Sequence, residues 1–253
     1  TVFQRNYILC EEGSSVELID EYEDKNDAIN NVYKILQIEK NANFNHTIVQ
    51  ENSFNHSLIL STHTICKESA NYNQHVYNFS EGYVRNFHFS DLKETNSQVD
   101  LQGFFFLRNS NTSNNKTFVR HSSDDCKSNQ AYKGILNDSS KATYFSNTHV
   151  DSVAQKTEGY QLSKGILLSK DAYFFSKPEL KIYADDVKCS HGSTIGPIDE
   201  NAIFYLRSRG ISKNAAIKML VSSFINEELN SIVNDYVFEM IEKKLIRYLS
   251  EIK

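Results

Sequence analysis

The first 182 residues consist of short runs of β-branched and aromatic residues, each ended by Asn, Ser, Asp or Gly. Apolar and polar residues alternate within the runs, which is the period of a half-buried strand. The runs recur about every ten residues, and this spacing predicts an all-β body. Examples are Tyr7-Ile8-Leu9, Val16-Glu17-Leu18-Ile19, Thr47-Ile48-Val49, Ser57-Leu58-Ile59-Leu60, His75-Val76-Tyr77 and Thr117-Phe118-Val119. Residues 27–36 fit either a short helix or an Asn-rich pair of strands.

A weak internal repeat distinguishes between architectures of this class. Gly103, Gly134 and Gly165 follow one another at intervals of thirty-one residues. A fixed period of about 20–50 residues is typical of a solenoid, in which stacked coils bury one another's apolar edges. The repeat therefore predicts a β-solenoid, with an antiparallel sandwich as the alternative.

The pattern changes from strands to helices after residue 192. Asp199 is a suitable N-cap for a helix that ends near Arg209, and Gly210 provides its stop signal. Ser212 then caps a second predicted helix. We expect two domains as a result, a β core over residues 1–197 and a helical domain over residues 198–253.

A third predicted helix begins near Leu229 and carries a continuous apolar stripe, because its apolar residues recur at steps of three and four. The stripe consists of Ile232, Val233, Tyr236, Val237, Met240, Ile241, Leu245, Tyr248, Leu249 and Ile252, and the opposite face holds Glu242, Lys243, Lys244 and Arg247. Such a stripe packs either on the core of its own chain or on a partner protein.

Composition argues against two classes of partner. Hydrophobic residues make up 40% of the chain and charged residues 23%, which is typical of a soluble globular protein. The net charge of -5 argues against a nucleic-acid-binding surface. The longest apolar run, residues 103–107, is far shorter than the roughly 18 residues of a membrane span.

The four cysteines are scattered and contain no Cys-x-x-Cys pair, which favours a reducing compartment over a disulfide framework. The chain opens at Thr1 without a methionine. We therefore expect a fragment or a processed form, with any targeting segment outside this sequence.

The motifs of common enzyme classes are missing: there is no phosphate-binding loop, dinucleotide fingerprint, His-Glu-x-x-His or Gly-x-Ser-x-Gly. The acidic pairs at 124–125 and 185–186 would suit a carbohydrate-cleaving solenoid. Adjacent carboxylates on a strand point to opposite faces, however, so we expect solvated corner residues. His121 and Cys126 form a second weak constellation, in which His121 is either a ligand or a solvated loop residue.

Cys189 and His191 are the strongest candidates for chemistry. They lie two residues apart, hence on one face of a strand, with Cα atoms about 6–7 Å from each other. A thiolate and an imidazole both bind zinc and iron, but two ligands do not complete a four-coordinate site. The missing ligands must come from elsewhere in the chain or from a partner. Two alternatives stay open: Cys189 shares the parity of Val187 and fits a core position, and a catalytic thiol–imidazole pair would lack an orienting third group.

Several motifs in the last half of the chain resemble one family. In chain order they are Tyr132-Lys133-Gly134-Ile135, Ala154-Gln155-Lys156-Thr157, Gly165-Ile166-Leu167-Leu168-Ser169, Lys177-Pro178-Glu179-Leu180, Ala184-Asp185-Asp186-Val187-Lys188-Cys189-Ser190-His191-Gly192, Ile195-Gly196, Asp199-Glu200 and Phe204-Tyr205-Leu206-Arg207-Ser208-Arg209-Gly210-Ile211. Together they resemble the SufB/SufD family of iron–sulfur cluster assembly scaffolds, and the Lys-Cys-Ser-His-Gly form is similar to its SufD branch. The specific resemblance covers about residues 130–211. Ser193 and Pro197 depart from the usual pattern, and the first hundred residues have drifted far.

The resemblance implies a mainly β fold, a right-handed parallel β-helix (β-solenoid) core followed by a C-terminal α-helical segment, without the N-terminal helical domain of the family. It implies a non-catalytic scaffold that pairs with a SufB-like chain through the last β-helix strands, or with itself in isolation. A SufC-like ABC-type ATPase would dock on the C-terminal helices and supply the ATP hydrolysis. The partner-binding residues expected there are Phe204, Tyr205, Arg207 and Arg209.

The same resemblance implies a cargo. A transient iron–sulfur cluster or iron would form where the two scaffold chains touch, with none bound permanently by this chain alone. His191 is expected as a ligand and Cys189 as its helper, and a cysteine of the partner would supply the missing ligand. The localisation would be cytoplasmic in a bacterium and a plastid-type organelle in a eukaryote. The rival function is a carbohydrate-binding or carbohydrate-cleaving β-helix protein, which needs a groove of paired carboxylates and aromatic residues.

Overall fold

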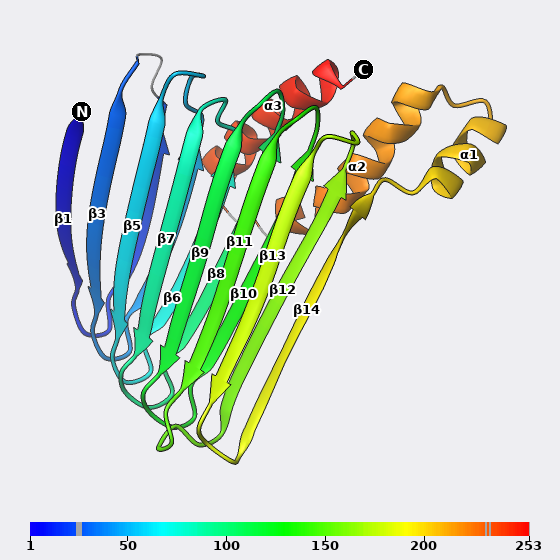
Figure 1. Ribbon diagram of the computed structural model, residues 1–253. Coiled ribbons are helices and arrows are strands. Elements are labelled where there is room, and N and C mark those ends of the chain that lie inside the picture. The colour runs from blue at the N-terminus through cyan, green and yellow to red at the C-terminus, as the bar shows by residue number, and fades with distance from the viewer. Residues whose placement is uncertain (24–26, 231, 233, 253) are drawn as a thin grey trace.

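The computed structural model describes residues 1–23, 27–230, 232 and 234–252, and it consists of a parallel β-solenoid followed by three helices (Figure 1). The strands are β1 (Val2–Cys10), β2 (Ser15–Tyr22), β3 (Ile29–Ile38), β4 (Asn43–Gln50), β5 (Ser57–Cys66), β6 (Asn71–Asn78), β7 (Tyr83–Leu92), β8 (Gln98–Leu107), β9 (Thr112–His121), β10 (Lys127–Leu136), β11 (Lys141–Val150), β12 (Thr157–Leu167), β13 (Tyr173–Ile182) and β14 (Val187–Pro197). The helices are α1 (Glu200–Ser208), α2 (Lys213–Asn230) and α3 (Asp235–Glu251). The predicted mainly β solenoid with C-terminal helices is confirmed.

Each coil contributes one strand to each of two seven-stranded sheets. Sheet A contains the odd-numbered strands in the order β1-β3-β5-β7-β9-β11-β13, and sheet B contains the even-numbered strands in the order β14-β12-β10-β8-β6-β4-β2. Neighbouring strands pair in parallel, for example β10 with β8 and β12. Residues 27–36, which fitted either a short helix or a strand pair, fall largely in the single strand β3, so both interpretations are corrected. Alternate side chains enter the lumen, which is why β5 alternates strictly between buried and half-buried positions.

The corners from sheet A to sheet B repeat one backbone conformation. A residue with positive φ lies at each of six successive corners: Gly13, Asn41, Ser69, Asn96, Asp125 and Lys156. The N–H of each donates to a carbonyl of the next corner, as in Asn41 to Glu68 (3.0 Å) and Lys156 to Asp186 (2.6 Å). Gly, Asn and Asp adopt this left-handed conformation most readily, and they supply most of these positions. Asp185 and Asp186 thus belong to the last corner of the ladder, as the sequence predicted.

The register corrects the predicted thirty-one-residue repeat. Gly134 pairs with Gly165 as expected, but Gly103 pairs with Tyr132. A Cβ at Gly103 would overlap the Tyr132 ring, and one at Gly134 would overlap the ring of Phe105. These glycines therefore recur because aromatic rings of neighbouring coils fill the space above them, and the coil length itself varies.

Buried amides and hydroxyls form hydrogen-bonded ladders along the lumen. Gln130 accepts from the Thr117 hydroxyl (2.5 Å) and donates to Thr148 Oγ1 (2.8 Å). Gln161, one coil further, donates to the same Thr148 oxygen (2.8 Å). Such ladders satisfy polar groups that would otherwise be buried without partners, and they extend toward the last coil.

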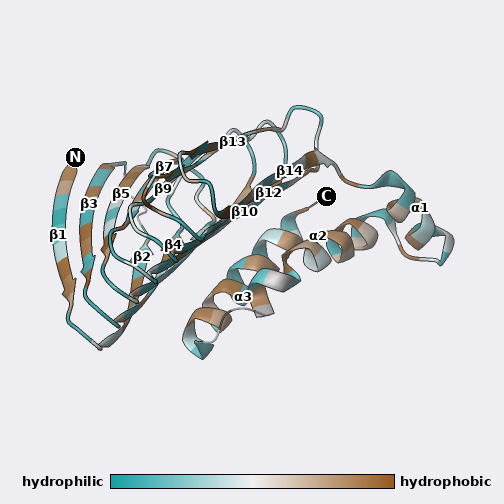
Figure 2. Ribbon diagram, turned by 90° about the horizontal axis from the view of Figure 1, so that it is seen from below, coloured by the Kyte–Doolittle hydropathy of each residue, from teal (hydrophilic) through white to brown (hydrophobic). Residues whose placement is uncertain are grey.

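Helices α2 and α3 cover the outer face of sheet B, whereas the described helices leave the outer face of sheet A open (Figure 2). One buried apolar cluster joins the two, with Val49, Tyr77, Phe79, Phe104, Phe106 and Ile135 from the solenoid and Val221, Ile225, Val237, Ile241, Leu245, Tyr248 and Ile252 from the helices and the C-terminal end. The apolar stripe therefore packs on its own chain.

The last strand ends at Pro197 and α1 begins at Glu200. The division of the chain into two domains at this point stays a prediction.

The helix caps agree with the sequence, but one boundary and one face do not. Asp199 caps α1 by accepting from the backbone N–H groups of residues 201 and 202. Helix α2 runs to Asn230 and α3 starts only at Asp235, because Asn234 provides a cap that the apolar periodicity does not reveal. Val233 of the predicted stripe lies outside the described residues. Lys244, assigned to the exposed face, is instead buried and paired with Glu23 and Glu51.

No helix in the described part of the chain is both long enough and apolar enough to span a membrane.

Candidate functional site

The last coil of the solenoid leaves two strand edges open. In the described part of the chain β14 pairs only with β12, and β13 pairs only with β11 (Figure 1). Each strand therefore presents a row of backbone N–H and C=O groups on its other side, and the lumen-facing side chains of this coil have no further coil above them.

Cys189 and His191 lie on the lumen-facing side of β14. Cys189 pairs with Gly159 and His191 pairs with Gln161, and both of these β12 residues are buried inside the solenoid. Residues that are paired in a parallel sheet point to the same face, so both side chains face the open end. The predicted common face is confirmed.

Cys189 is half-buried and packs against a small apolar cluster of Val150, Ala154 and Ala184. Its Sγ lies 3.3 Å from the position that a Cβ on Gly159 would occupy, so the glycine leaves room for the sulfur. Burial raises the pKa of the Cys189 thiol, and a hydrogen bond with the Gly159 backbone lowers it in part. The thiolate needed for metal binding therefore requires a nearby cation or metal.

His191 is exposed at the same end. Gln161 beneath it uses its amide group for Thr148 Oγ1 (2.8 Å) and for the Glu179 carbonyl (3.1 Å). No described residue forms a hydrogen bond with the His191 side chain, so either ring nitrogen is available for a ligand. The pair thus combines an accessible imidazole with a thiol anchored in the core.

No group of three or more His, Cys, Asp or Glu residues that could hold a metal ion occurs in the described part of the chain. Cys189 and His191 therefore offer two ligands at an open protein surface. A four-coordinate centre built on them needs further ligands from outside this set.

The other pair singled out in the sequence is not a site. His121 and Cys126 are both fully buried, so neither is a solvated loop residue or an accessible ligand. His121 Nε2 lies 2.8 Å from Ser128 Oγ, and Cys126 Sγ lies 3.3 Å from Ser97 Oγ. The loop interpretation of His121 was wrong, because β9 extends to this residue and turns it into the lumen.

Helix α1 carries a second exposed surface directly after β14. Its single buried residue, Ile203, packs with Ala216 of α2. Phe204 and Tyr205, on the other side, are 73% and 58% exposed. The Arg209 guanidinium lies 5.3 Å from the centre of the Tyr205 ring, and Arg207 is also exposed. Exposed aromatic residues beside arginines are typical of protein interfaces.

Gly159 and Gln161 support the candidate site but were not predicted from the sequence. They precede Cys189 and His191 by one coil of thirty residues. A register assigned coil by coil could have found them, whereas the glycine repeat alone could not.

Comparison with known proteins identifies the family. Residues 1–224 match the family model described as SUF system FeS cluster assembly, SufBD core domain. The chain belongs to the SufBD family. It is 29% identical to the iron–sulfur cluster assembly protein SufD of Escherichia coli over 230 residues, which are 90% of this chain and 54% of that protein. It is 30% identical to the chloroplastic protein ABCI7 of Arabidopsis thaliana over 241 residues. These residues are 91% of this chain and 49% of that protein.

A SufD of Plasmodium falciparum is 27% identical over 208 residues, or 76% of this chain and 14% of that protein. The SufBD chain described here therefore spans about half the length of the first two relatives. The family assignment agrees with the solenoid and with the resemblance stated from the motifs, and it extends the resemblance to the first hundred residues.

Proposed function

We propose that this SufBD-family chain is a scaffold subunit for iron–sulfur cluster assembly, which holds part of a nascent cluster at the open end of its solenoid. The observation that carries the proposal is the pair on β14: Cys189 and His191 share one face at an edge that no described strand covers. Soft thiolate and imidazole ligands suit iron. The cluster is cargo that passes through the site.

A SufB-like chain is the proposed partner at this edge. The free edges of β13 and β14 offer backbone groups to which a second solenoid can add strands. A cysteine of the SufB-like chain would complete the ligand set to which this chain contributes Cys189 and His191. The alternative partner at the same edge is a second copy of this chain, which would bring two Cys–His pairs together.

The proposed energy source is a SufC-like ABC-type ATPase docked on α1. Phe204, Tyr205 and Arg207 on this helix and Arg209 at its C-cap are exposed and support the assignment. The scaffold itself is proposed to be non-catalytic. We propose a bacterial cytoplasm or a plastid-type organelle as its compartment, since similar proteins are found in Escherichia coli and in the chloroplast of Arabidopsis.

The rival carbohydrate-cleaving function has little support. Asp185 and Asp186 lie at a corner, where Asp186 accepts from Lys156 through its backbone carbonyl. Asp125 occupies an equivalent corner with positive φ. Asp125 and Asp186 line one surface depression of about 460 Å³ together with three lysines, and no aromatic residue that could hold a sugar ring is among its described lining residues.

Anaerobic co-purification with SufB-like and SufC-like partners tests the proposal. We expect a complex that contains all three chains. When iron and sulfide are supplied, this complex should bind them in equal amounts. Tyr205→Ala should release the ATPase while the SufB-like chain stays bound, and Tyr7→Ala, which replaces an exposed tyrosine on β1 at the opposite end of sheet A, should release neither. Failure of the wild-type chain to bind either partner would refute the scaffold assignment.

A further inference from the structure

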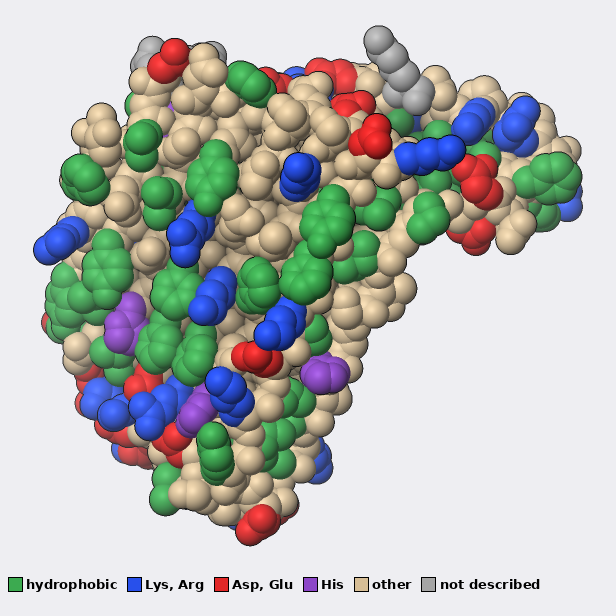
Figure 3. Space-filling model, viewed as in Figure 1, with side chains coloured by type: hydrophobic (Ala, Val, Ile, Leu, Met, Phe, Trp, Pro, Cys, Tyr) green, Lys and Arg blue, Asp and Glu red, His purple; other side chains and the backbone are tan. Residues whose placement is uncertain are grey.

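The outer face of sheet A carries a basic and aromatic groove. Figure 3 shows Lys and Arg side chains mixed with hydrophobic side chains on this face. The groove has a volume of about 620 Å³ and crosses β7, β9, β11 and β13. Four cations line it, Arg85, Lys116, Lys177 and Lys181, together with the single carboxylate Glu179. Its local charge is thus positive although the whole chain carries a net charge of -5.

The register arranges the groove as an alternating row. Phe87, Lys116, Phe145 and Lys177 are paired in turn across the four strands. Strands of a sheet are about 4.8 Å apart, so the Cα atoms of the two lysines lie about 10 Å from each other with a phenyl ring between them. This spacing allows one ligand to contact both lysines and the ring.

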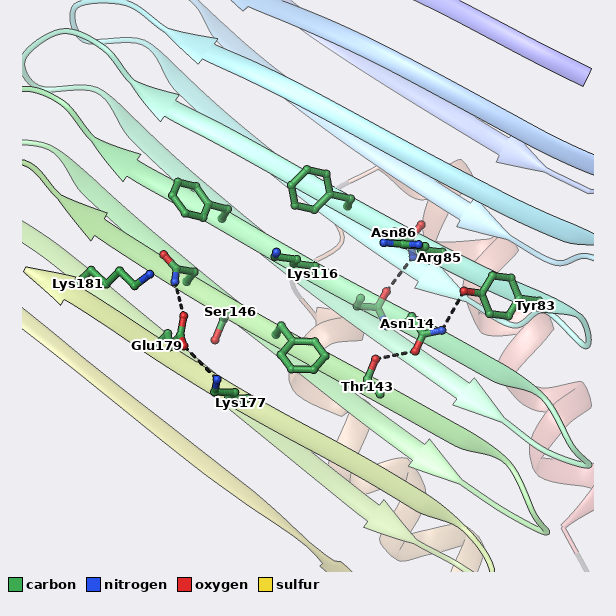
Figure 4. A pocket seen from close by; sticks show the side chains of 15 residues that line it. Tyr83, Arg85, Asn86, Asn114, Lys116, Thr143, Ser146, Lys177, Glu179 and Lys181 are labelled. Atoms are coloured by element: carbon green, nitrogen blue, oxygen red, sulfur yellow. Dashed lines mark hydrogen bonds and ion pairs between the residues drawn. The ribbon is translucent and has the colours of Figure 1, made fainter.

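Most of the cations are not neutralised within the chain. Lys177 Nζ lies 3.1 Å from Glu179 Oε1. In the described part of the protein Arg85, Lys116 and Lys181 form no ion pair, and Lys116 Nζ lies 5.4 Å from the centre of the Phe87 ring (Figure 4). Cations that keep no carboxylate partner attract an anionic ligand, and phosphate groups match lysine and arginine well.

Asn147 adds a second, independent feature. It lies on β11 two residues after Phe145 and is only 7% exposed. Its Nδ2 donates to Glu179 Oε2 (2.8 Å), whereas its Oδ1 is buried in the groove lining with no hydrogen-bond partner among the described residues. The carboxylate accepts only, so this contact fixes which amide atom is the oxygen. A buried acceptor without a partner is rare, and an N–H donor that reaches it from the groove would satisfy it.

Exposed phenyl rings complete the surface. Phe145 is 38% exposed and Phe175 is 41% exposed, and their ring centres are 5.8 Å apart. An aromatic side chain binds a planar ring of a ligand by stacking, and its face also attracts a neighbouring cation.

We propose that this groove binds a nucleotide with an amino-bearing purine base. The base stacks on Phe145 and donates its amino N–H to Asn147 Oδ1, and the phosphates contact Lys116 and Lys177. This site lies on the outer face of sheet A and does not involve Cys189 or His191, so it stands apart from the proposed scaffold function.

Calorimetric titration of the whole chain with four probes tests the proposal: ADP, IDP, pyrophosphate and a single-stranded oligoadenylate. We expect ADP to bind about tenfold more tightly than pyrophosphate, because the base adds stacking and one hydrogen bond. IDP has an oxygen in place of the amino group and should bind several-fold more weakly than ADP.

Three variants locate the contacts. Lys116→Gln should weaken ADP binding about tenfold through loss of a charge-assisted contact. Asn147→Leu should remove the preference for ADP over IDP. Lys141→Gln, a matched control at the start of β11 and outside the groove lining, should bind ADP like the wild type. Thermal unfolding of each variant checks that it is folded, and the Lys116→Gln result stands even if Asn147→Leu does not fold.

Several outcomes would overturn the proposal. These are no binding of ADP at about 1 mM, equal affinity for pyrophosphate and ADP, or equal weakening by Lys116→Gln and Lys141→Gln. Tighter binding of the oligoadenylate than of ADP would assign the groove to a nucleic acid instead.

Discussion

Acidification should destabilise the solenoid through histidines enclosed in its lumen, and His121 is the clearest case. The side chain is fully buried, with Nε2 2.8 Å from Ser128 Oγ. Its Nδ1 has no hydrogen-bond partner among the described residues. Burial lowers the pKa of His121 from 6.5 to about 4, and burial also lowers the pKa of His88, to about 3. Both imidazoles are therefore neutral in the folded protein near pH 7.

The sign of the effect follows from the lowered pKa. Between pH 6.5 and pH 4 the unfolded chain binds a proton at His121 that the folded chain does not bind. The stability contributed by the neutral imidazole is present above the unfolded pKa and is lost as the pH falls toward the folded pKa. The shift from 6.5 to about 4 corresponds to a loss of about 2 kcal/mol in the free energy of unfolding between pH 8 and pH 5.

Urea unfolding at pH 8 and pH 5 measures this difference. His121→Gln cannot be protonated, so its free energy of unfolding should fall by about 2 kcal/mol less than that of the wild type over this range. Ser128→Ala keeps the imidazole and removes only its hydroxyl partner, and it should retain the pH dependence of the wild type. If His121→Gln loses as much stability on acidification as the wild type does, His121 is not buried in its neutral form.

Two further predictions concern packing. Gly134→Val places a side chain against the Phe105 ring and should lower the free energy of unfolding by about 1–3 kcal/mol, whereas Gly196→Ala, with no atom within 4 Å of its new Cβ, should change the urea midpoint little. Equal midpoints for the two variants would show that the ring does not occupy this space. Lys244→Met removes the buried cation between Glu23 and Glu51 and should cost about 1–2 kcal/mol, because Glu51 keeps its pair with Arg247 and Glu23 is half exposed, while the exposed Lys243→Met should cost less than about 0.5 kcal/mol. Thermal unfolding compares this pair, and equal losses would contradict the role assigned to the buried network.

Local patterns in the sequence predicted the solenoid, its last corner and the caps of α1. Strand alternation and the cap at Asp199 depend on residues close in sequence, so their physical causes are visible there. The coil register was harder to predict. Gly103 pairs with Tyr132 because the coils differ in length, and no fixed period describes them.

Burial in the lumen was the main feature that sequence reasoning missed. His121 ends a strand pattern and is followed by a loop-like Ser-Ser-Asp-Asp segment, yet the strand ladder places its side chain in the lumen. Lys244 likewise reads as a surface residue until Glu23 and Glu51, about two hundred residues earlier, are brought beside it. Contacts over such distances depend on the fold and are not encoded in a local pattern.

The candidate site was predicted in part. Cys189 and His191 share one face because of their spacing alone, but the free edge beside them depends on β14 being the last strand of its sheet. The α1 surface was expected from the family resemblance, and its exposure comes from the packing of Ile203 toward α2.

The most direct test of the central claim is a measurement of iron and sulfide. It is made on the complex that assembles anaerobically with SufB-like and SufC-like partners. His191→Ala should lower the cluster content at least about tenfold relative to the wild type while all three chains still co-purify, because one ligand is lost at the shared edge. Ser190→Ala, which changes an exposed β14 residue of the opposite parity, should keep the wild-type content. Full cluster content in the His191→Ala complex would contradict the assignment of this end of the solenoid as the place where the cluster is held.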